Sequence, residues 1–530
     1  MPRLGVGIGL GQFSGGGGGS AYDADAQAFF DRVSTAGGSL STIEKSAVNQ
    51  LVLDLKSYSI WTKMKAIYPM VGASAAACAQ NLKSSSFTGT FNGGWTYAST
   101  GITGNGTSGY MNTGLNDLND LGANATIAIY VNADGIQTTN WLLGVYSSPT
   151  ISGMSIANAG SGNYINIKSG VSSIYGQSYI GGLFLGTTNG TTNQVYKNAT
   201  NKGNNSQTTT GLNLSHYIGA LNSNGTSILY DDKRVALVSY SNFTFTGTDV
   251  SNFYTAVQTF NQSLSRQVGA QIVSDPDAQA FVNRVYNAGG TLTNTEANAV
   301  NQLTIDLKSI GVWSSMKAIY PMVGASAAAC AQNLKSSSFT GTFSGGWTYA
   351  SSGVTPNGTS GYMNTGFVPS TDFSSSTSFG LFLYTSSTTA SNNARDLGAF
   401  TNSGVPSFSL TSKDQTSSKT DLYDYANRIS VSGYNVEGFY IGSRTASNSA
   451  KLYRNGTSIG TTTGAAGTAP SIYITLGGVN NSSSNPITSV IGFDSKTFSI
   501  AGFCDGLTDT EASNFYTAVQ TFQTTLSRQV

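Results

Sequence analysis

Residues Ala66–Gly114 read AIYPMVGASAAACAQNLKSSSFTGTFNGGWTYASTGITGNGTSGYMNTG, and this stretch returns 252 residues later as Ala318–Gly366 with four substitutions. A period this long exceeds that of a solenoid repeat, so each copy is expected to be a complete domain with its own core. The copies also end alike, because Ser251–Phe260 (SNFYTAVQTF) reappears as Ser513–Phe522 at an offset of 262 residues. Between these ends the copies diverge, which favours a common frame that carries different loops.

Composition limits the class of protein. The chain has 530 residues, of which 39% are hydrophobic, and two domains of this size suit a β-sandwich or barrel. Charged residues make up 10% and the formal net charge is +1, which disfavours nucleic acid and anionic membranes as partners. No apolar run approaches the roughly 20 residues of a spanning helix, and no signal peptide is recognisable. We expect a soluble product that is made in a cytoplasm and does not insert into a membrane.

Val6, Ile8 and Leu10 alternate with glycines near the amino terminus, and a glycine run follows at Gly15–Gly19. Such alternation is compatible with a thin β-strand. The simpler interpretation of residues 1–20 is a disordered tail. The functional interpretation is a virion anchor that adds a strand to the sheet edge of a partner, with the glycines as a hinge.

Helical signals open each copy, in the segments 21–83 and 275–335. A helix is predicted over 26–36, because a glycine pair follows it in the manner of a C-terminal cap. Capping boxes at Ser41–Glu44 and Thr293–Glu296 start the next helix of each copy. The apolar stripe of that helix could pack on the neighbouring sheet or on another subunit, and core packing is the commoner use.

A sequence pattern typical of β-strands follows each helical segment, over residues 84–268 and 336–530. Residues 269–274 form a short linker between the copies. Short runs rich in Ser, Thr and aromatic residues between glycines are typical of strands and turns. A capping box at Thr508–Glu511 predicts a short closing helix. Asn-Gly pairs suit two-residue hairpin turns because both positions tolerate positive φ. Such pairs begin at Asn105, Asn189, Asn224, Asn357 and Asn455.

Several motifs carry a resemblance to a known fold family. In chain order within the copies they are Gly106–Tyr110 and Gly358–Tyr362 (GTSGY), Tyr453–Gly456 (YRNG), Gly492–Asp494 (GFD) and Leu507–Ala512 (LTDTEA). Their order resembles the concanavalin A-like, laminin G-like jelly roll. This resemblance implies a mainly β chain of two tandem jelly-roll β-sandwiches, each preceded by a short helical hairpin and closed by a short helix.

The helical prefix of each copy carries a second resemblance. Its end, AIYPMVG, resembles a segment found ahead of such domains in tailed-bacteriophage virion proteins. This resemblance implies that the chain is a component of a phage particle.

The carboxylates do not form the pattern of a glycan hydrolase. Some concanavalin A-like enzymes place two carboxylates on one strand, whereas three of the four glutamates here start helices and Glu437 has no neighbouring carboxylate. His216 is the only histidine and is interpreted as a structural strand residue. The second copy therefore cannot hold a Ser-His-Asp or Cys-His arrangement, and the chain is expected not to be an enzyme.

Metal sites leave only weak traces. Cys78, Cys330 and Cys504 are too few and too scattered for a disulfide framework or a metal site, and are expected to be small buried side chains. The laminin G-like resemblance makes calcium possible, with Asp231 and Asp494 at equivalent places as candidates. The alternative at each place is a structural aspartate that faces solvent.

Sugar binding in this fold class generally uses aromatic rings on loops, assisted by Asn and Asp side chains. The tryptophans that recur in both copies, Trp61/Trp313 and Trp95/Trp347, are assigned to packing of the shared frame. Several aromatic residues of the divergent middles must also be core residues. The candidates for carbohydrate binding are Trp141, Tyr146, Tyr175, Tyr423 and Tyr425, with Tyr164, Tyr179 and Tyr434 as further possibilities.

These observations predict a non-enzymatic bacteriophage virion appendage, which is a tail or head (capsid) fibre or a decoration protein. Its amino terminus would join other virion proteins, and its loops would bind host-surface glycans weakly and multivalently. A homo-oligomer is compatible with this role. The alternatives are a purely structural virion protein that reinforces capsid or tail without binding sugar, and a bacterial surface adhesin.

Overall fold

The computed structural model describes residues 22–133, 140–155, 163–169, 173–175, 181–206, 208, 211–388, 394–401, 406–423 and 425–530. The chain divides into two compact units, Met1–Val268 and Gly269–Val530. The division falls where the first β domain was expected to end and the linker to begin. Each unit is mainly β and contains its own helices, so a helical segment and the β segment after it fold together.

A layer of helices covers one side of the first unit. It consists of α1 (Ala24–Thr35), α2 (Thr42–Ser57) and α4 (Gly247–Ser263). The capping box predicted at Ser41 is present, and an unpredicted one at Thr246 starts α4. The apolar face of α2 belongs to one core cluster with α1, α4 and the adjacent sheet. The prediction that this stripe serves core packing is confirmed.

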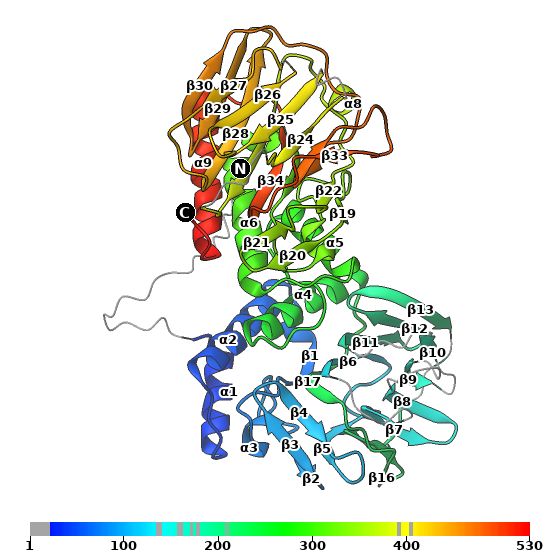
Figure 1. Ribbon diagram of the computed structural model, residues 1–530. Helices are drawn as coiled ribbons and strands as arrows, with labels where there is room; N and C mark the ends of the chain where they lie inside the picture. The colour runs from blue at the N-terminus through cyan, green and yellow to red at the C-terminus, as the bar shows by residue number, and fades with distance from the viewer. Residues whose placement is uncertain are drawn as a thin grey trace, which may run out of the picture. The chain divides into compact units, whose positions relative to one another are not determined.

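Two sheets complete the first unit (Figure 1). The inner sheet packs against the helices and has the order β13-β12-β11-β6-β17-β4-β3, with β1 on β17. The outer sheet has the order β10-β9-β8-β7-β14-β5-β2, with β15 beside β7 and β16 beside β15. The inner strands are β1 (Met64–Tyr68), β3 (Trp95–Ala98), β4 (Gly101–Gly104), β6 (Asn124–Ala133), β11 (Gly182–Asn189), β12 (Thr192–Lys197), β13 (Thr200–Ser206) and β17 (Arg234–Ser241). The outer strands are β2 (Thr90–Asn92), β5 (Tyr110–Asn116), β7 (Leu143–Ser147), β8 (Thr150–Ser155), β9 (Asn163–Ser169), β10 (Ser173–Tyr175), β14 (Ser215–Ile218), β15 (Leu221–Ser223) and β16 (Thr226–Ile228).

The two sheets differ in how many faces they bury. On the inner strand β6, Tyr130 lies in the helix-facing cluster, while its neighbours Ile129 and Val131 lie in the cluster between the sheets. On the outer strand β5, Met111 is buried between the sheets, whereas Asn112 beside it is partly exposed. A sheet that is buried on one face alternates in this way. At β5, the face of the outer sheet that points away from the inner sheet is therefore partly open to solvent.

The second unit repeats this architecture. Its helices are α5 (Pro276–Asn287), α6 (Asn294–Ser309) and α9 (Asp509–Thr525), and its inner sheet has the order β20-β21-β34-β23-β28-β29-β30, with β18 on β34. Its outer sheet has the order β19-β22-β31-β24-β25-β26-β27, with β32 beside β24 and β33 beside β32. The inner strands are β18 (Met316–Tyr320), β20 (Trp347–Ala350), β21 (Gly353–Pro356), β23 (Phe379–Thr385), β28 (Gly438–Ala446), β29 (Ser449–Arg454), β30 (Thr457–Thr462) and β34 (Phe498–Cys504). The outer strands are β19 (Thr342–Ser344), β22 (Tyr362–Asn364), β24 (Leu397–Phe400), β25 (Ser407–Thr411), β26 (Ser418–Leu422), β27 (Ile429–Val431), β31 (Thr475–Leu476), β32 (Gly478–Asn480) and β33 (Val490–Ile491).

Short helical turns occur in both units. They are α3 (Ala75–Cys78), α7 (Ala327–Cys330), α8 (Pro369–Asp372) and the 3-10 turns η1 (Trp61–Lys63) and η2 (Val312–Ser315). The cysteines of α3 and α7 are free and buried, and so is Cys504, as expected. Burial raises the pKa of the Cys78 and Cys330 thiols to about 12. All three side chains act as small core residues.

The duplicated stretches hold each other in place. Arg266, from the repeated LSRQV end, donates hydrogen bonds to the carbonyls of Pro69 (2.7 Å) and Met70 (2.9 Å). Arg528 makes the same bonds to Pro321 and Met322 in the second unit. Burial lowers the pKa of each arginine to about 10, and the carbonyl oxygens satisfy its donors. This contact explains why the end of the module and its central stretch recur together.

The structure corrects two sequence predictions about secondary structure. The closing helices α4 and α9 each have 17 residues and are not short. The Asn-Gly pairs at Asn189, Asn224 and Asn455 form hairpin turns, but those at Asn105 and Asn357 do not. Instead, each pair connects an inner strand with an outer strand. The Asn105 side-chain oxygen accepts hydrogen bonds from the backbone N–H groups of Thr107, Ser108 and Gly109. An Asn side chain that caps a turn in this way needs no paired strands.

Candidate functional site

The only histidine lies in a buried polar cluster of the first unit. His216 Nε2 lies 3.0 Å from Asp117 Oδ1, and Lys168 Nζ lies 3.9 Å from the same oxygen. All three side chains are inaccessible to solvent. Burial alone would raise the pKa of Asp117, but the hydrogen bond with His216 and the charges of His216 and Lys168 outweigh it and lower that pKa. Sequence reasoning missed this cluster because Asp117 and His216 are 99 residues apart.

The calcium candidates are occupied by lysines. Asp231 lies 3.0 Å from Lys233 Nζ, and Asp494 lies 3.0 Å from Lys496 Nζ, which also contacts Asp396 at 2.6 Å. Asp231 is 2% exposed and Asp494 is 0% exposed, so the alternative that they face solvent is wrong. An ammonium group already supplies the positive charge at each carboxylate, so these residues do not fit a calcium site. Within the described residues, no group of three or more His, Cys, Asp and Glu could hold a metal ion.

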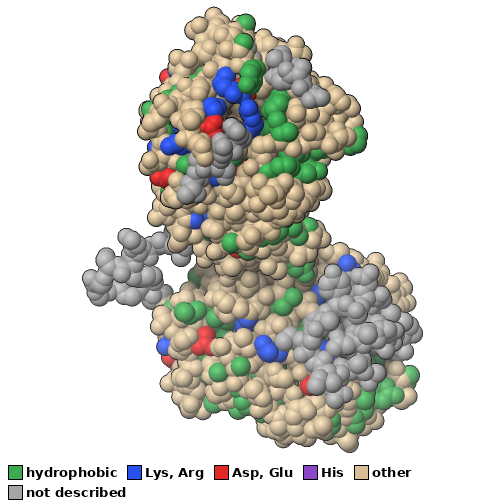
Figure 2. Space-filling view, in the orientation of Figure 1, with side chains coloured by type: hydrophobic (Ala, Val, Ile, Leu, Met, Phe, Trp, Pro, Cys, Tyr) green, Lys and Arg blue, Asp and Glu red, His purple; other side chains and the backbone are tan. Residues whose placement is uncertain are grey.

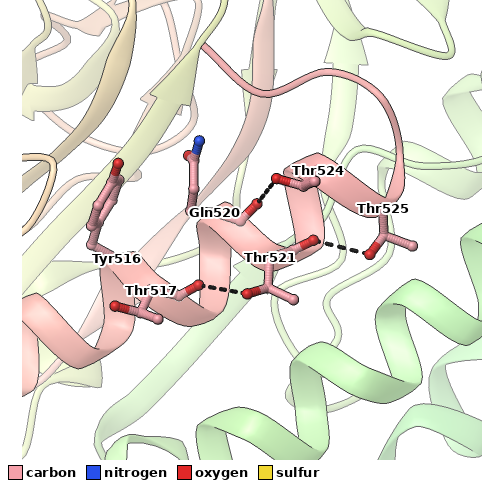
Figure 3. Close-up of a pocket in the computed structure, with 6 residues that line it drawn as sticks. All are labelled: Tyr516, Thr517, Gln520, Thr521, Thr524 and Thr525. Atoms are coloured by element: carbon pink, nitrogen blue, oxygen red, sulfur yellow. Dashed lines mark hydrogen bonds between the residues drawn. The ribbon is translucent and has the colours of Figure 1, made fainter. Parts of the chain in front are cut away.

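Two surface hollows lie beside the helices. One, of about 330 Å³, follows α9 and is lined by Tyr516, Gln520 and four threonines. Figure 3 shows the hydroxyls of Thr521, Thr524 and Thr525 bonded to backbone carbonyls of the same helix. The other, of about 520 Å³, lies in the first unit and is lined mainly by small polar residues beside Glu44, whose carboxylate caps α2. The four threonine hydroxyls of the first hollow and the Glu44 carboxylate of the second are therefore used within the fold.

Two predicted sugar-binding residues frame one strand of the first outer sheet. Trp141 stands two residues ahead of β7, and its backbone N–H donates to the Leu229 carbonyl (3.0 Å). Tyr146 lies near the other end of β7, where it pairs with Ile151 of β8. Both side chains are partly exposed. The structure therefore brings Trp141 and Tyr146 to opposite ends of the same strand.

An arginine takes the place of Trp141 in the second unit. The N–H of Arg395 donates to the Gly492 carbonyl (2.8 Å), as that of Trp141 does to its own partner, and β24 begins two residues later. By the same register, Phe400 corresponds to Tyr146. The Arg395 guanidinium lies 5.3 Å from the centre of the Phe400 ring. One position of the shared frame thus carries an aromatic ring in one unit and a cation in the other.

Tyr425 lies beside this arginine. Its side chain is 44% exposed, and the Arg428 guanidinium lies 4.2 Å from the centre of its ring. Arg428 in turn pairs with Asp421, with Nε and Oδ1 2.5 Å apart. The Asp421 side chain is 0% exposed. Its burial is compatible with a charge because the arginine compensates it.

The other candidates have different outcomes. Tyr423 is 1% exposed and stacks on Phe379 at 3.7 Å, so the hypothesis that it offers a ring to a sugar is wrong. Its ring belongs to the core between the sheets. Tyr434 is partly exposed and its carbonyl accepts from Lys413 (2.6 Å). The side chains of Tyr164 and Tyr175 lie outside the described part of the chain, as do Tyr179, Val6, Ile8 and Leu10.

The recurring tryptophans behave as expected. Trp61 is 5% exposed and belongs to the helix-facing core, and Trp313 packs at the edge of the matching core. Trp95 and Trp347 pack against the cluster between the sheets. The sequence did not point to Arg395 and Arg428, because sugar binding in this fold class is expected of aromatic rings with Asn and Asp side chains. The only signal in the sequence was the equivalence of residues 141 and 395, which the divergent middles conceal.

Comparisons with known proteins give no family. No protein-family model matches the chain, and no curated protein matches it. In the part of the chain that the structure describes, no helix is both long and apolar enough to cross a membrane.

Several solved structures show weak likeness. Domain 4 of AbnA, an extracellular GH43 arabinanase from Geobacillus stearothermophilus in complex with arabinotriose, is 14% identical at a TM-score of 0.30, covering 36% of this chain and 98% of that domain. A mutant Trypanosoma rangeli sialidase that displays trans-sialidase activity is 13% identical at a TM-score of 0.30, covering 41% of this chain and 38% of the sialidase. The NanB sialidase from Streptococcus pneumoniae is 16% identical at a TM-score of 0.20, with 24% of each chain covered. Likenesses this weak do not transfer the activities of these proteins to this chain.

Proposed function

We propose that the chain is a non-enzymatic, glycan-binding appendage of a bacteriophage particle. In this proposal its two β-sandwich units present the ends of their outer sheets to sugars on the host surface. One observation carries the glycan-binding part. At matched positions just ahead of β7 and β24 in the two outer sheets, a partly exposed side chain of a type that binds sugars is present, Trp141 in the first unit and Arg395 in the second.

The chemistry of these side chains supports sugar binding. An aromatic ring offers an apolar face to the C–H groups of a sugar, and an arginine offers several donors to its oxygens. Neither unit needs high affinity, because several linked sites on one particle can raise the overall affinity by about 10²–10⁴. The assignment as non-enzymatic is supported by the ion pairs of these buried carboxylates, since Asp421 pairs with Arg428 and Asp494 shares Lys496 with Asp396.

The location on a phage particle is supported by the resemblance of the helical prefix to virion proteins. Residues 1–20, with Val6, Ile8 and Leu10, are the proposed attachment to other virion proteins. Deletion of these residues should release the protein from purified particles, which an immunoblot of washed particles measures. Retention of the truncated protein would place the attachment elsewhere.

The test of glycan binding uses the full-length, fluorescently labelled chain on an array of bacterial surface polysaccharides. We expect binding that periodate oxidation of the array abolishes and that the double variant Trp141→Ala/Arg395→Ala loses. Tyr286→Ala is the matched control, because Tyr286 is an exposed aromatic residue (37%) on α5, away from the outer sheet. Absence of binding to every polysaccharide would favour the alternative, a virion protein that only reinforces capsid or tail.

A further inference from the structure

At the end of the outer sheet of the second unit, the described residues place two guanidinium groups beside the carboxylate of Asp421. Arg428 binds Asp421 through two parallel bonds, Nε to Oδ1 (2.5 Å) and Nη2 to Oδ2 (2.6 Å). The hydroxyls of Ser407 and Ser409 also donate to Asp421 Oδ2, at 2.8 and 2.9 Å. The acceptor positions of this carboxylate are therefore largely occupied, and it neutralises one arginine only.

Arg395 is the second guanidinium. Among the described residues, no carboxylate oxygen lies within ion-pair distance of Arg395, whereas Arg428 has Asp421. Burial and then the charge of Arg428 lower the pKa of Arg395, and the charge of Asp421 opposes this shift. Among the described residues of this cluster, two guanidinium groups therefore face one carboxylate.

Aromatic side chains hold Arg395 and leave it accessible. Tyr425 hydrogen-bonds with both arginines and is 44% exposed, and the Phe400 ring lies 5.3 Å from the Arg395 guanidinium. Arg395 itself is partly exposed. Figure 2 shows Lys and Arg side chains gathered beside hydrophobic ones on the face of this unit that carries β24, β25 and β26. A guanidinium fixed by neighbours loses little entropy when it binds an anion.

We propose that Arg395, Arg428 and Tyr425 form a site for the carboxylate of an acidic saccharide, such as a uronic acid. The planar fork of an arginine matches the two oxygens of a carboxylate, and the exposed Tyr425 ring offers a face to the sugar ring. The matched position of the first unit carries Trp141, which suits a neutral sugar. This inference rests on the proposed glycan-binding function and names the ligand class of one of its two sites.

The scattered charge of the chain argues against nucleic acid as the source of the anion. Nucleic-acid binding uses an extended basic stripe, and the formal net charge of this chain is +1. The ligand should therefore be recognised by one carboxylate on a sugar ring, and not by a row of phosphates.

The test is calorimetric titration of the full chain with a mannuronate oligosaccharide and with its carboxyl-reduced, neutral form. Arg395→Gln should weaken binding of the acidic oligosaccharide about 10- to 100-fold, the range expected for a lost charge-assisted hydrogen bond. Lys451→Gln removes the same charge from the inner-sheet strand β29 and should leave that affinity unchanged. Arg395→Trp, which installs the residue of the first unit, should lose the preference for the acidic form.

The outcomes separate the two proposals. Equal affinity of the wild-type chain for both oligosaccharides, or an acidic preference that survives Arg395→Gln, would overturn the acidic site. The glycan-binding function would then still stand if Trp141→Ala reduced binding of neutral sugars. A sulfated dextran that binds through Arg395 while the mannuronate does not would overturn the carboxylate in favour of a sulfate.

Discussion

One buried position of the shared frame holds a basic side chain, Lys168, in the first unit and an aromatic side chain, Tyr423, in the second. Lys168 in the first unit and Tyr423 in the second both adopt a left-handed conformation, with φ of 54° and 69°. Lys168 Nζ donates to the backbone carbonyl of Asp117 (2.6 Å), and the Tyr423 hydroxyl donates to that of Pro369 (3.4 Å). In each unit, the polar end of this side chain therefore donates to the equivalent backbone carbonyl.

The surroundings of the two side chains differ. In the first unit, Thr113 donates to the carbonyl of His216, and in the second, Thr365 donates to that of Ile474, both at 2.8 Å. A histidine beside a buried aspartate in one unit is therefore an isoleucine in the other. The backbone frame fixes the position and its hydrogen bonds, while an ion cluster and an aromatic core fill it equally well. This difference indicates that the frame of the module tolerates wide exchange of chemistry, at buried and exposed positions alike.

The largest expected effect comes from removing the carboxylate of the buried ion cluster in the first unit. Asp117→Ala would leave the Lys168 ammonium buried without its carboxylate, which should cost the first unit about 3–5 kcal/mol of unfolding free energy. Hydrogen exchange of first-unit peptides in the full chain measures the loss. The matched change Tyr423→Phe removes one hydrogen bond from the second unit and should cost only about 1 kcal/mol. Similar losses for both variants would contradict the ionic account.

The pH dependence of this cluster has a definite sign. The pKa of Asp117 is lower in the folded state than in the unfolded state. The stability that Asp117 gives the first unit is therefore complete above the unfolded pKa of about 4, and it is lost as the pH falls through the pKa of the folded state. Asp117→Asn should therefore flatten the acid limb of first-unit stability, which hydrogen exchange at pH 3 to 6 would follow. An unchanged acid limb would show that other carboxylates control it.

Replacing the whole ion cluster should be milder than breaking it. The triple variant Asp117→Leu/Lys168→Met/His216→Leu makes the position apolar, as in the second unit. Because no charge stays buried, we expect it to recover at least about 2 kcal/mol relative to Asp117→Ala. Urea unfolding of the full chain, followed by first-unit hydrogen exchange, gives the comparison. A triple variant less stable than the single one would mean that the charges specify the fold of this unit.

A second matched position should respond to pH in the opposite direction. Burial and the charge of Asp396 raise the pKa of Asp494 to about 7. The stabilisation that this carboxyl group contributes to the second unit is therefore complete below the unfolded pKa of about 4 and is lost as the pH rises to about 7. Asp494→Asn should remove this slope. In the first unit Leu142 stands in the place of Asp396, so the slope that Asp231 produces should be shallower; equal slopes would contradict the role of Asp396.

The smallest effect concerns the hairpin between β12 and β13. Its turn residues Asn198 and Ala199 have φ of 47° and 64°, whereas the second unit has Asn455 and Gly456 at 49° and 75°. A left-handed alanine costs about 1 kcal/mol, so Ala199→Gly should raise the melting temperature of the first unit slightly. Gly456→Ala should lower that of the second, since a new Cβ would lie 3.1 Å from Tyr516 Cβ. A destabilising Ala199→Gly would show that the turn is not strained.

The sequence predicted the shared frame better than the site. The duplicated stretch, the capping boxes at Ser41 and Thr293 and most Asn-Gly turns depend on local chemistry, and the structure has the two β-sandwich units with packed helices. The ion cluster could not be predicted, because Asp117 and His216 meet only when β5 and β14 pair. Tyr423 was misassigned for a related reason, since its neighbours along the chain do not reveal that it stacks on Phe379.

The exposed site shows the same limit. Trp141 and Arg395 become equivalent only through the hydrogen bonds that start β7 and β24, and the sequences around them do not align. A pattern of aromatic residues could therefore suggest Trp141 and Tyr425, but it could not suggest an arginine as the counterpart of a tryptophan.

The central claim is that equivalent positions of the two units bind different classes of sugar. The most direct test compares the glycan-array binding profile of the full chain with the profiles of the variants Trp141→Ala and Arg395→Gln. The account predicts that the first variant loses neutral polysaccharides, that the second loses carboxylate-bearing ones, and that each keeps what the other loses. Two variant profiles identical to that of the wild-type chain would contradict it.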